Sequence, residues 1–208
     1  SDVIDRLIAK EEHKEANLES NQREILSSVF RSQLPQIKKV EFNVETQALG
    51  ENGAPIMITQ SEYMRRMKEM ANIQAGMSFY GEMPNMYNLV LNADHKLVKQ
   101  VLTDADNSCK AALEPIESEM ANLNNRRKEL QKAQEGKKTE DIPQAEKDEL
   151  NDIEKKISDE TTKKQAVLGE YANGNKIIHQ LIDLALLQNN MLKGEALTNF
   201  VKRSIELI

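Results

Sequence analysis

The C-terminal part of this chain is too apolar to lie on the surface of a small domain. Residues 176–189 predict a helix whose apolar side chains cover well over half of its circumference, and residues 195–208 predict a second helix after Gly194. A helix that is apolar on most of its sides has to be buried. We therefore expect two copies of the chain to pair these helices in an intermolecular four-helix bundle. The predicted dimer contacts are Ile177, Leu181, Leu184, Leu187, Leu192, Leu197, Phe200, Val201 and Ile205.

The N-terminal residues lead into the domain. Residues 1–20 are charged and show little apolar periodicity, so we interpret them as a segment that arrives from a preceding domain. Residues 21–33 predict a helix, because apolar side chains recur on one face with helical spacing. Pro35 ends this helix, since the residue before a proline is disfavoured in helical conformation. The apolar face consists of Ile25, Leu26, Val29 and Phe30.

Three short segments predict a small sheet. Apolar and polar residues alternate over residues 40–45, the pattern of a half-buried strand. Residues 50–53 contain two glycines and predict a turn, and Ile56 and Ile58 continue on its far side, so we expect the two strands to form a hairpin. Residues 86–91 predict a third strand, apolar enough to be the central one.

Two further helices are expected around the third strand. Ser61 can cap a helix that runs to about Gly76, and the acidic Glu62 suits its first turn. Asp94 is expected to cap the next helix, and we interpret the neighbouring His95 as a residue of the helix start. The apolar positions of that helix are Leu97, Val98, Val101 and Leu102.

Residues 104–172 predict an inserted antiparallel helical hairpin. Both arms repeat apolar residues at alternating spacings of three and four, the pattern of a coiled-coil seam. Residues 134–144 contain Gly136 and Pro143 and predict the turn between the arms. Charged residues interrupt the seam, so each arm is expected to depend on the other to stay helical. The seam positions are Leu113, Ile116, Met120, Leu123, Arg127 and Leu130, then Leu150, Ile153, Ile157, Glu160, Lys164, Val167 and Tyr171.

These elements predict an α+β fold: a small three-stranded sheet with flanking helices, the inserted hairpin, and C-terminal helices in an intermolecular four-helix bundle. The chain carries 28 basic and 34 acidic residues, a net charge of -6. This balance argues against nucleic acid as a partner, because phosphate binding requires a concentrated basic face. The domain is expected to cover residues 21–208, with the hairpin inserted at 104–172.

Candidate catalytic and metal-binding residues are few. His13, His95 and His179 lie far apart and lack metal-ligand spacing, so no metal and no cofactor is expected in this chain. Cys109 is the only cysteine, and its surroundings lack the glycine turn or nearby histidine of a nucleophile. With no signal-peptide pattern and no apolar run of membrane-spanning length, we predict a cytoplasmic protein with no membrane partner.

Several stretches of the sequence, taken together, carry a resemblance to a known family. In their order and spacing they resemble the amphipathic helix, the strand with the following helix start, and the dimerisation helices of the C-terminal domain of the bacterial ninety-kilodalton heat-shock chaperones. The resemblance covers about residues 23–102 and 173–208. The stretches are residues 61–70 (SEYMRRMKEM), 79–84 (FYGEMP), 87–95 (YNLVLNADH), 184–187 (LALL) and 192–197 (LKGEAL).

The resemblance implies a role in a chaperone cycle. In that family ATP is bound and hydrolysed by N-terminal and middle domains, so this chain is not expected to be an enzyme. Its C-terminal domain holds two ATPase arms together as a homodimer and contacts unfolded or partly folded client proteins. Methionine suits such contacts because it is flexible and polarisable. The client-contact residues that the resemblance implies are Tyr63, Met64, Met67, Met70, Met77, Phe79 and Tyr80.

Two features depart from the family pattern. The hairpin at 104–172 replaces a short connection, so the resemblance assigns it no role. The sequence ends in Glu-Leu-Ile instead of an acidic tail, so no helical-repeat co-chaperone is expected as a partner. The alternative hypothesis is a coiled-coil structural adaptor whose hairpin, residues 108–172, binds a partner protein. A more distant alternative is an enzyme that uses Cys109.

Overall fold

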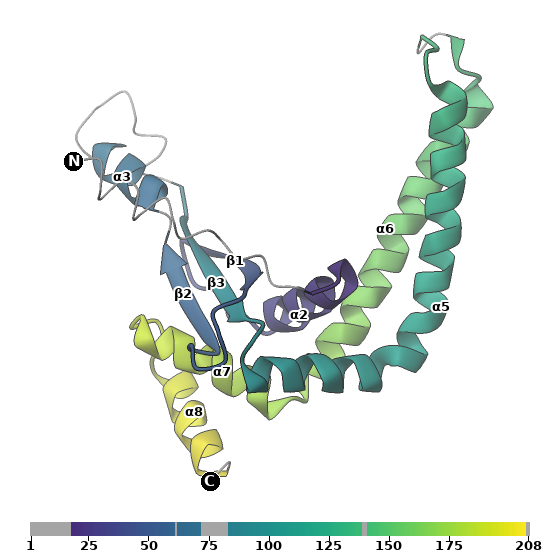
Figure 1. Ribbon diagram of the computed structural model, residues 1–208. Helices are drawn as coiled ribbons and strands as arrows, with labels where there is room; N and C mark the ends of the chain where they lie inside the picture. Colours follow the sequence, from purple (N-terminus) through teal and green to yellow (C-terminus); the bar gives the residue numbers. More distant parts are fainter. Residues whose placement is uncertain (1–17, 61, 72–82, 139–140, 207–208) are drawn as a thin grey trace.

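The computed structural model of the chain describes residues 18–60, 62–71, 83–138 and 141–206. The sheet and the first described helix lie beside the base of a long helical hairpin, residues 96–173, and the two C-terminal helices follow at that base (Figure 1). The predicted α+β fold is confirmed, while the intermolecular bundle concerns a second copy and stays a prediction. The described elements are α2 (Ser20–Ser32), β1 (Val40–Gln47), β2 (Ile56–Gln60), α3 (Glu62–Ala71), β3 (Asn85–Asn92), α5 (Lys96–Gln134), α6 (Gln144–Asn173), α7 (Lys176–Gln188) and α8 (Glu195–Glu206).

The small sheet has β3 as its central strand. β3 pairs in parallel with β1, where Val44 lies opposite Leu89, and antiparallel with β2, where Ile58 lies opposite the same leucine. Leu89, Val90 and Leu91 are at most 2% exposed, the burial typical of a strand that is covered on both faces. The prediction that the third strand is central is confirmed.

The predicted hairpin between the first two strands is wrong, because β1 and β2 both pair with β3 and not with each other. Asn92, at the end of β3, holds the loop that connects them. Its fully buried side chain donates to the Gly50 carbonyl at 2.8 Å and accepts from the Leu49 amide at 3.1 Å. β1 and β2 are thus separated by β3, a strand that comes later in the chain. A local turn pattern does not reveal a pairing of this kind.

α2 forms and packs as its sequence pattern predicts. Glu19 and Gln22 form a reciprocal capping box at its start. The helix lies within one residue of the predicted range at each end. Its apolar face joins the large core that the sheet, α5, α6 and α7 also supply. The buried residues of this face, at most 2% exposed, are the predicted Ile25, Leu26, Val29 and Phe30.

The start of α5 differs by one residue from the prediction. His95 is the N-cap, and its Nδ1 accepts from the Leu97 amide at 3.2 Å. Asp94, the predicted cap, instead accepts from the Gly50 amide at 2.8 Å. Asp94 as the helix cap is therefore wrong, because its carboxylate serves the β1–β2 loop, whereas the interpretation of His95 as a helix-start residue is confirmed.

α5 is one continuous helix that bends along its length. Its first part runs along the base of the molecule, and its second part rises beside α6 (Figure 1). Pro115 lies inside the helix. A proline there has no N–H for the carbonyl of Ala111, and its ring crowds that carbonyl, which bends a helix. The predicted hairpin boundary at residue 104 lies within α5, so no break in the helix marks it.

The predicted turn between the arms is confirmed, since α5 ends at Gln134 and α6 begins at Gln144. The arms are also joined along their outer side, where Arg126 Nε donates to Glu149 Oε1 at 2.7 Å. Several seam positions are buried between the arms, as predicted. Those at most 9% exposed are Leu113, Leu123, Leu130, Ile153 and Lys164.

The apolar interior of the described residues falls into two clusters. The large one holds the body together and includes Leu113 and Leu168 at the base of the hairpin. The small one lies further out along the hairpin and consists of Leu123, Leu130 and Ile153, with Ile157 packed against it. We call the part of the hairpin beyond the large cluster, residues 121–160, the distal arm.

This division predicts that the distal arm can be removed without unfolding the body. Deleting residues 121–160 and joining the two helices through a short glycine-rich turn leaves Leu113 and Leu168 in place. We expect the shortened chain to keep one cooperative transition in scanning calorimetry. Deleting residues 108–172 removes both leucines and should abolish that transition, and a shortened chain that also melts without cooperativity would contradict the division.

Candidate interaction surfaces

α7 is seated on the body by one apolar face. Asn175 caps it, with Oδ1 accepting from the Ile178 amide at 3.0 Å. Ile178, Ile182 and Leu186 follow one another at intervals of four residues and are at most 1% exposed. This face contacts β2, α2 and α5. Only the outer side of α7 is therefore left for α8.

A left-handed turn reverses the chain after α7. Asn190 has a φ of 57°. The Met191 amide donates to the Leu186 carbonyl at 2.8 Å, and the Asn190 amide donates to the Leu187 carbonyl at 3.1 Å. These two bonds form a Schellman motif, which satisfies the last carbonyls of a helix. After this turn, α8 runs from the end of α7 to the C-terminus below the sheet (Figure 1).

Polar links hold α7 and α8 together in an antiparallel pair. Lys176 Nζ lies 2.6 Å from Glu206 Oε2, and Gln180 Nε2 donates to Ser204 Oγ at 2.6 Å. These links were not predicted from the sequence. The sequence does carry a signal for them, because complementary polar residues occur on both helices. An antiparallel pairing places Lys176 opposite Glu206 and Gln180 opposite Ser204.

A further link, the ion pair of Asp183 and Arg203, is half-buried, with side chains 17% and 22% exposed. Burial raises the pKa of Asp183, and the charges of Arg203 and His179 oppose that rise. Because this pKa is higher in the folded chain than in the unfolded one, protonation of Asp183 favours folding as the pH falls through it.

α8 is the least covered helix of the pair, since none of its side chains is buried. Val201 is 48% exposed and Ile205 is 69% exposed, and Leu187 on α7 is 37% exposed. Leu197 and Phe200 turn toward the body and pack partly against the large core. We call Leu187, Val201 and Ile205 the C-terminal apolar surface.

Some predicted dimer contacts are already covered within one copy of the chain. Leu181 and Leu192 are 4% and 5% exposed and belong to the large core. Ile177 and Leu184 are half-buried. The surface that one copy leaves open is therefore narrower than the predicted set and is centred on α8.

The predicted client-contact residues on α3 are exposed to different degrees. Tyr63 and Met70 are 68% and 45% exposed. Met64 and Met67 are half-buried, and Ala71 is the one residue of this helix that is buried. The predicted contacts Met77, Phe79 and Tyr80 lie outside the described residues, as do the predicted helix cap Ser61 and helix end Gly76.

The polar side of α3 is ordered by ion pairs. Hydrogen bonds from Arg65 and Arg66 lower the pKa of Glu62 to about 2. Lys68 Nζ donates to Asn85 Oδ1 at 2.8 Å, which links α3 to the start of β3. The cationic side chains are thus engaged locally, and the exposed apolar part of the helix is Tyr63 and Met70.

The exposed large apolar residues within the described ranges all belong to the two predicted contact sets. Isolated exposed apolar side chains are common, but four of these five lie on α3 and α8, and α3 buries only Ala71 while α8 buries none of its side chains. The residues are Tyr63 and Met70 on α3, and Leu187, Val201 and Ile205 on α7 and α8.

The candidate nucleophile Cys109 is only 3% exposed. Burial, helped by the charge of Asp106, raises the pKa of its thiol, which disfavours the thiolate that a nucleophile needs. Within the described ranges, no three or more histidine, cysteine or acidic side chains are grouped to hold a metal ion. No helix there combines the length and apolar character needed to cross a membrane.

The fold and these surfaces define an α+β module in which α3 and α8 carry exposed apolar side chains. No family model matches the chain, and no solved structure does. Among known proteins, the chain is 67% identical to the chaperone protein HtpG of Bacteroides fragilis and 64% identical to that of Bacteroides thetaiotaomicron, in each case over 208 residues. It is 44% identical to HtpG of Porphyromonas gingivalis over 210 residues.

These similarities cover 100% of this chain and 30% of each relative. The chain fits the C-terminal domain of the HtpG chaperones. The resemblance to the bacterial ninety-kilodalton heat-shock chaperones that the sequence suggested is therefore confirmed. The similarity to these relatives also extends over the hairpin at residues 104–172.

The ion pair between α7 and α8 leads to a prediction about Asp183. We expect Arg203→Met to raise the pKa of Asp183 further, because burial then acts against less positive charge. A carbon-13 NMR titration of the Asp183 carboxyl group measures this. Lys202→Met, at the exposed neighbouring position, should leave the pKa unchanged. Equal shifts in both variants would show that the ion pair does not form.

Proposed function

We propose that this chain is the C-terminal dimerisation and client-contact domain of an ATP-dependent molecular chaperone. The observation that carries the proposal is α8, a helix with no buried side chain and with Val201 and Ile205 turned outward. A helix of this kind gains little from packing on its own body, since helical stability comes mostly from burial of an apolar face. A second copy of α7 and α8 would supply that burial.

Dimerisation of this kind would tether the ATPase arms of two copies. On this proposal ATP is bound and hydrolysed in parts of the chaperone outside these 208 residues. Holding two arms at one base makes their meeting intramolecular, with an effective concentration in the millimolar range. The domain therefore contributes to the cycle mechanically. We propose that the chaperone works in the cytoplasm, where thiols such as Cys109 stay reduced.

The second part of the proposal is client contact through α3. Tyr63 and Met70 offer an aromatic and a flexible apolar side chain, and the ion pairs of Glu62 with Arg65 and Arg66 lie on the polar side of the helix. Methionine adapts to many partners, which suits a surface for unfolded or partly folded proteins.

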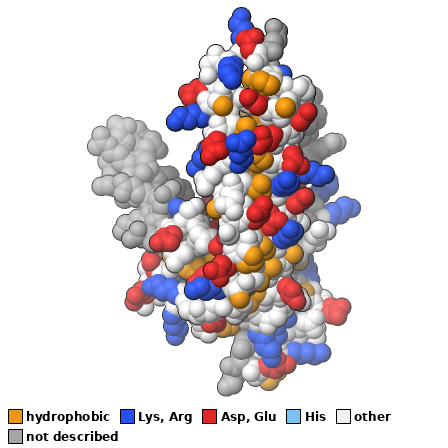
Figure 2. Space-filling view, turned by 90° about the vertical axis from the view of Figure 1, so that its right-hand side faces the viewer, with side chains coloured by type: hydrophobic (Ala, Val, Ile, Leu, Met, Phe, Trp, Pro, Cys, Tyr) orange, Lys and Arg blue, Asp and Glu red, His pale blue; other side chains and the backbone are white. Residues whose placement is uncertain are grey.

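The alternative, a coiled-coil adaptor that acts through the hairpin, is tested by the chain that lacks the distal arm. Figure 2 shows the face of the molecule on which the hairpin lies, where basic and acidic side chains alternate and apolar ones lie between them. Interspersed charges of this kind are typical of a solvated helix face. A shortened chain that still dimerises supports the chaperone domain, and one that loses its protein partner supports the adaptor.

We expect Val201→Glu combined with Ile205→Glu to give monomers. The two carboxylates would be buried without partners in the proposed bundle, at a cost of several kcal/mol. Sedimentation velocity at several concentrations measures the result. Thr198→Glu combined with Asn199→Glu adds the same charge at polar, exposed positions of α8 and should leave the dimer intact. A full dimer in the double variant would place the interface elsewhere.

We expect Tyr63→Ser with Met70→Ser to weaken binding of a permanently unfolded protein, reduced and carboxymethylated α-lactalbumin. Each side chain loses apolar area that a client would cover, worth roughly 25 cal/mol per Å². Fluorescence anisotropy of the labelled client reports the affinity. Arg66→Ser, on the charged side of α3, is the control. Unchanged affinity in the double variant, with unfolding still cooperative, would exclude α3 as the contact.

A further inference from the structure

Lys164 joins α6 to two other helices. Its side chain is 6% exposed, and its Nζ lies 3.1 Å from Glu24 Oε2 on α2 and 3.2 Å from Glu117 Oε1 on α5. Asn21 Oδ1, also on α2, accepts from the same Nζ at 3.4 Å. The two contacts with α2 are hydrogen bonds, and the contact with Glu117 on α5 is an ion pair. The adjacent Lys163, by contrast, pairs only with Glu160 of its own helix.

The position of Lys164 along the hairpin is distinctive. It occupies a seam position that an apolar residue would fill in a regular coiled coil. It lies between the two apolar clusters, after Ile157 of the small one and before Leu168 of the large one. Where the hairpin leaves the body, the contact between its arms is therefore ionic.

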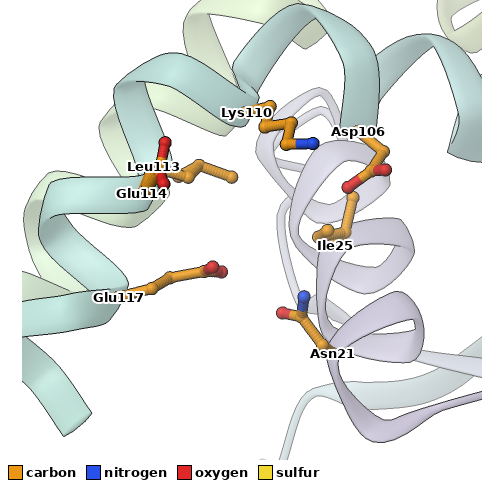
Figure 3. Close-up of a pocket in the computed structure, with 7 residues that line it drawn as sticks. All are labelled: Asn21, Ile25, Asp106, Lys110, Leu113, Glu114 and Glu117. Carbon is orange, nitrogen blue, oxygen red and sulfur yellow. The ribbon is translucent and has the colours of Figure 1, made fainter.

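The bend of α5 lies at the same level. Glu117 comes two residues after Pro115, where the helix lacks one backbone hydrogen bond. Inside the bend, α5 and α2 enclose a hollow of about 220 Å³. Figure 3 shows Glu117 and Asn21 directed toward one another across it. Leu113 and Ile25 line this hollow on its apolar side. The gap means that side-chain packing between α5 and α2 constrains the angle of the bend less than a filled interface would.

We infer that Lys164 sets the angle at which the distal arm leaves the body. The lysine connects α6 to Glu117 just beyond the bend and to Asn21 and Glu24 on α2. The direction of the arm is thereby tied to α2, the helix that follows the N-terminal residues. This role concerns the hairpin and does not depend on dimerisation or client contact.

The lever is long enough for a small change of angle to be measured. From Pro115 to Lys132 the helix extends roughly 25 Å at 1.5 Å per residue. A swing of about 10° at the bend therefore moves Lys132 by about 4 Å. Electron–electron resonance between two spin labels resolves displacements of that size.

The experiment places spin labels at Lys132→Cys on the arm and Thr59→Cys on β2, both exposed positions. Cys109 can stay, because its burial protects it from labelling. The labelled chain is diluted into an excess of unlabelled chain, so that distances between copies do not contribute. We expect Lys164→Met to shift or broaden the distance distribution by about 4 Å or more, the displacement of a 10° swing.

Lys163→Met is the matched control, and its distribution should equal that of the parent. Glu24→Gln and Glu117→Gln each remove one carboxylate and keep the buried lysine, so they test the idea even if Lys164→Met does not fold. Each should broaden the distribution by less than Lys164→Met. An unchanged, narrow distribution in these variants would overturn the inference. Sedimentation of the same samples keeps this result separate from the proposed dimerisation, which these variants should not affect.

Discussion

The burial of one face of α7 is the constraint on which the rest of the structure depends. Ile178, Ile182 and Leu186 are almost inaccessible to solvent and bring together β2, α2 and α5. Since this face is fully occupied within the chain, α8 has only the outer side of α7 to pack on. Val201 and Ile205 of α8 are exposed because this helix packs on α7 with only one of its sides. The core of the domain and the proposed surface for a second copy are therefore opposite sides of one helix pair.

Much of the fold could be predicted because it follows from local patterns. The apolar face of α2, the turn after Gln134 and the break before α7 each depend on residues close together in sequence. The exposed residues Tyr63 and Ile205 were also within the predicted contact sets. An excess of apolar side chains on a helix is visible in the sequence, whatever covers them later.

The features that could not be predicted depend on contacts between distant residues. β3 pairs with both earlier strands, and the side chain of Asn92 at its end holds a loop more than 40 residues earlier in the chain. Leu181 and Ile205 look alike in the sequence, yet one is buried within the chain and the other is exposed. Periodicity shows that a residue needs a neighbour, but it does not show which segment supplies it. Lys164 is the clearest case, since a charge in a seam suggests a weak contact until its partners on two other helices are known.

The separation of the interior into two clusters has a consequence for how the molecule loses its structure. Local opening requires only the contacts of the unit that opens to break. The distal arm contains only Leu123, Leu130 and Ile153 as buried apolar residues among those described. Its backbone amides should therefore exchange with solvent through excursions in which the sheet and α7 stay closed. On heating or in denaturant, the distal arm should therefore unfold before the body. The domain then consists of two units of unequal stability, although α5 runs unbroken through both.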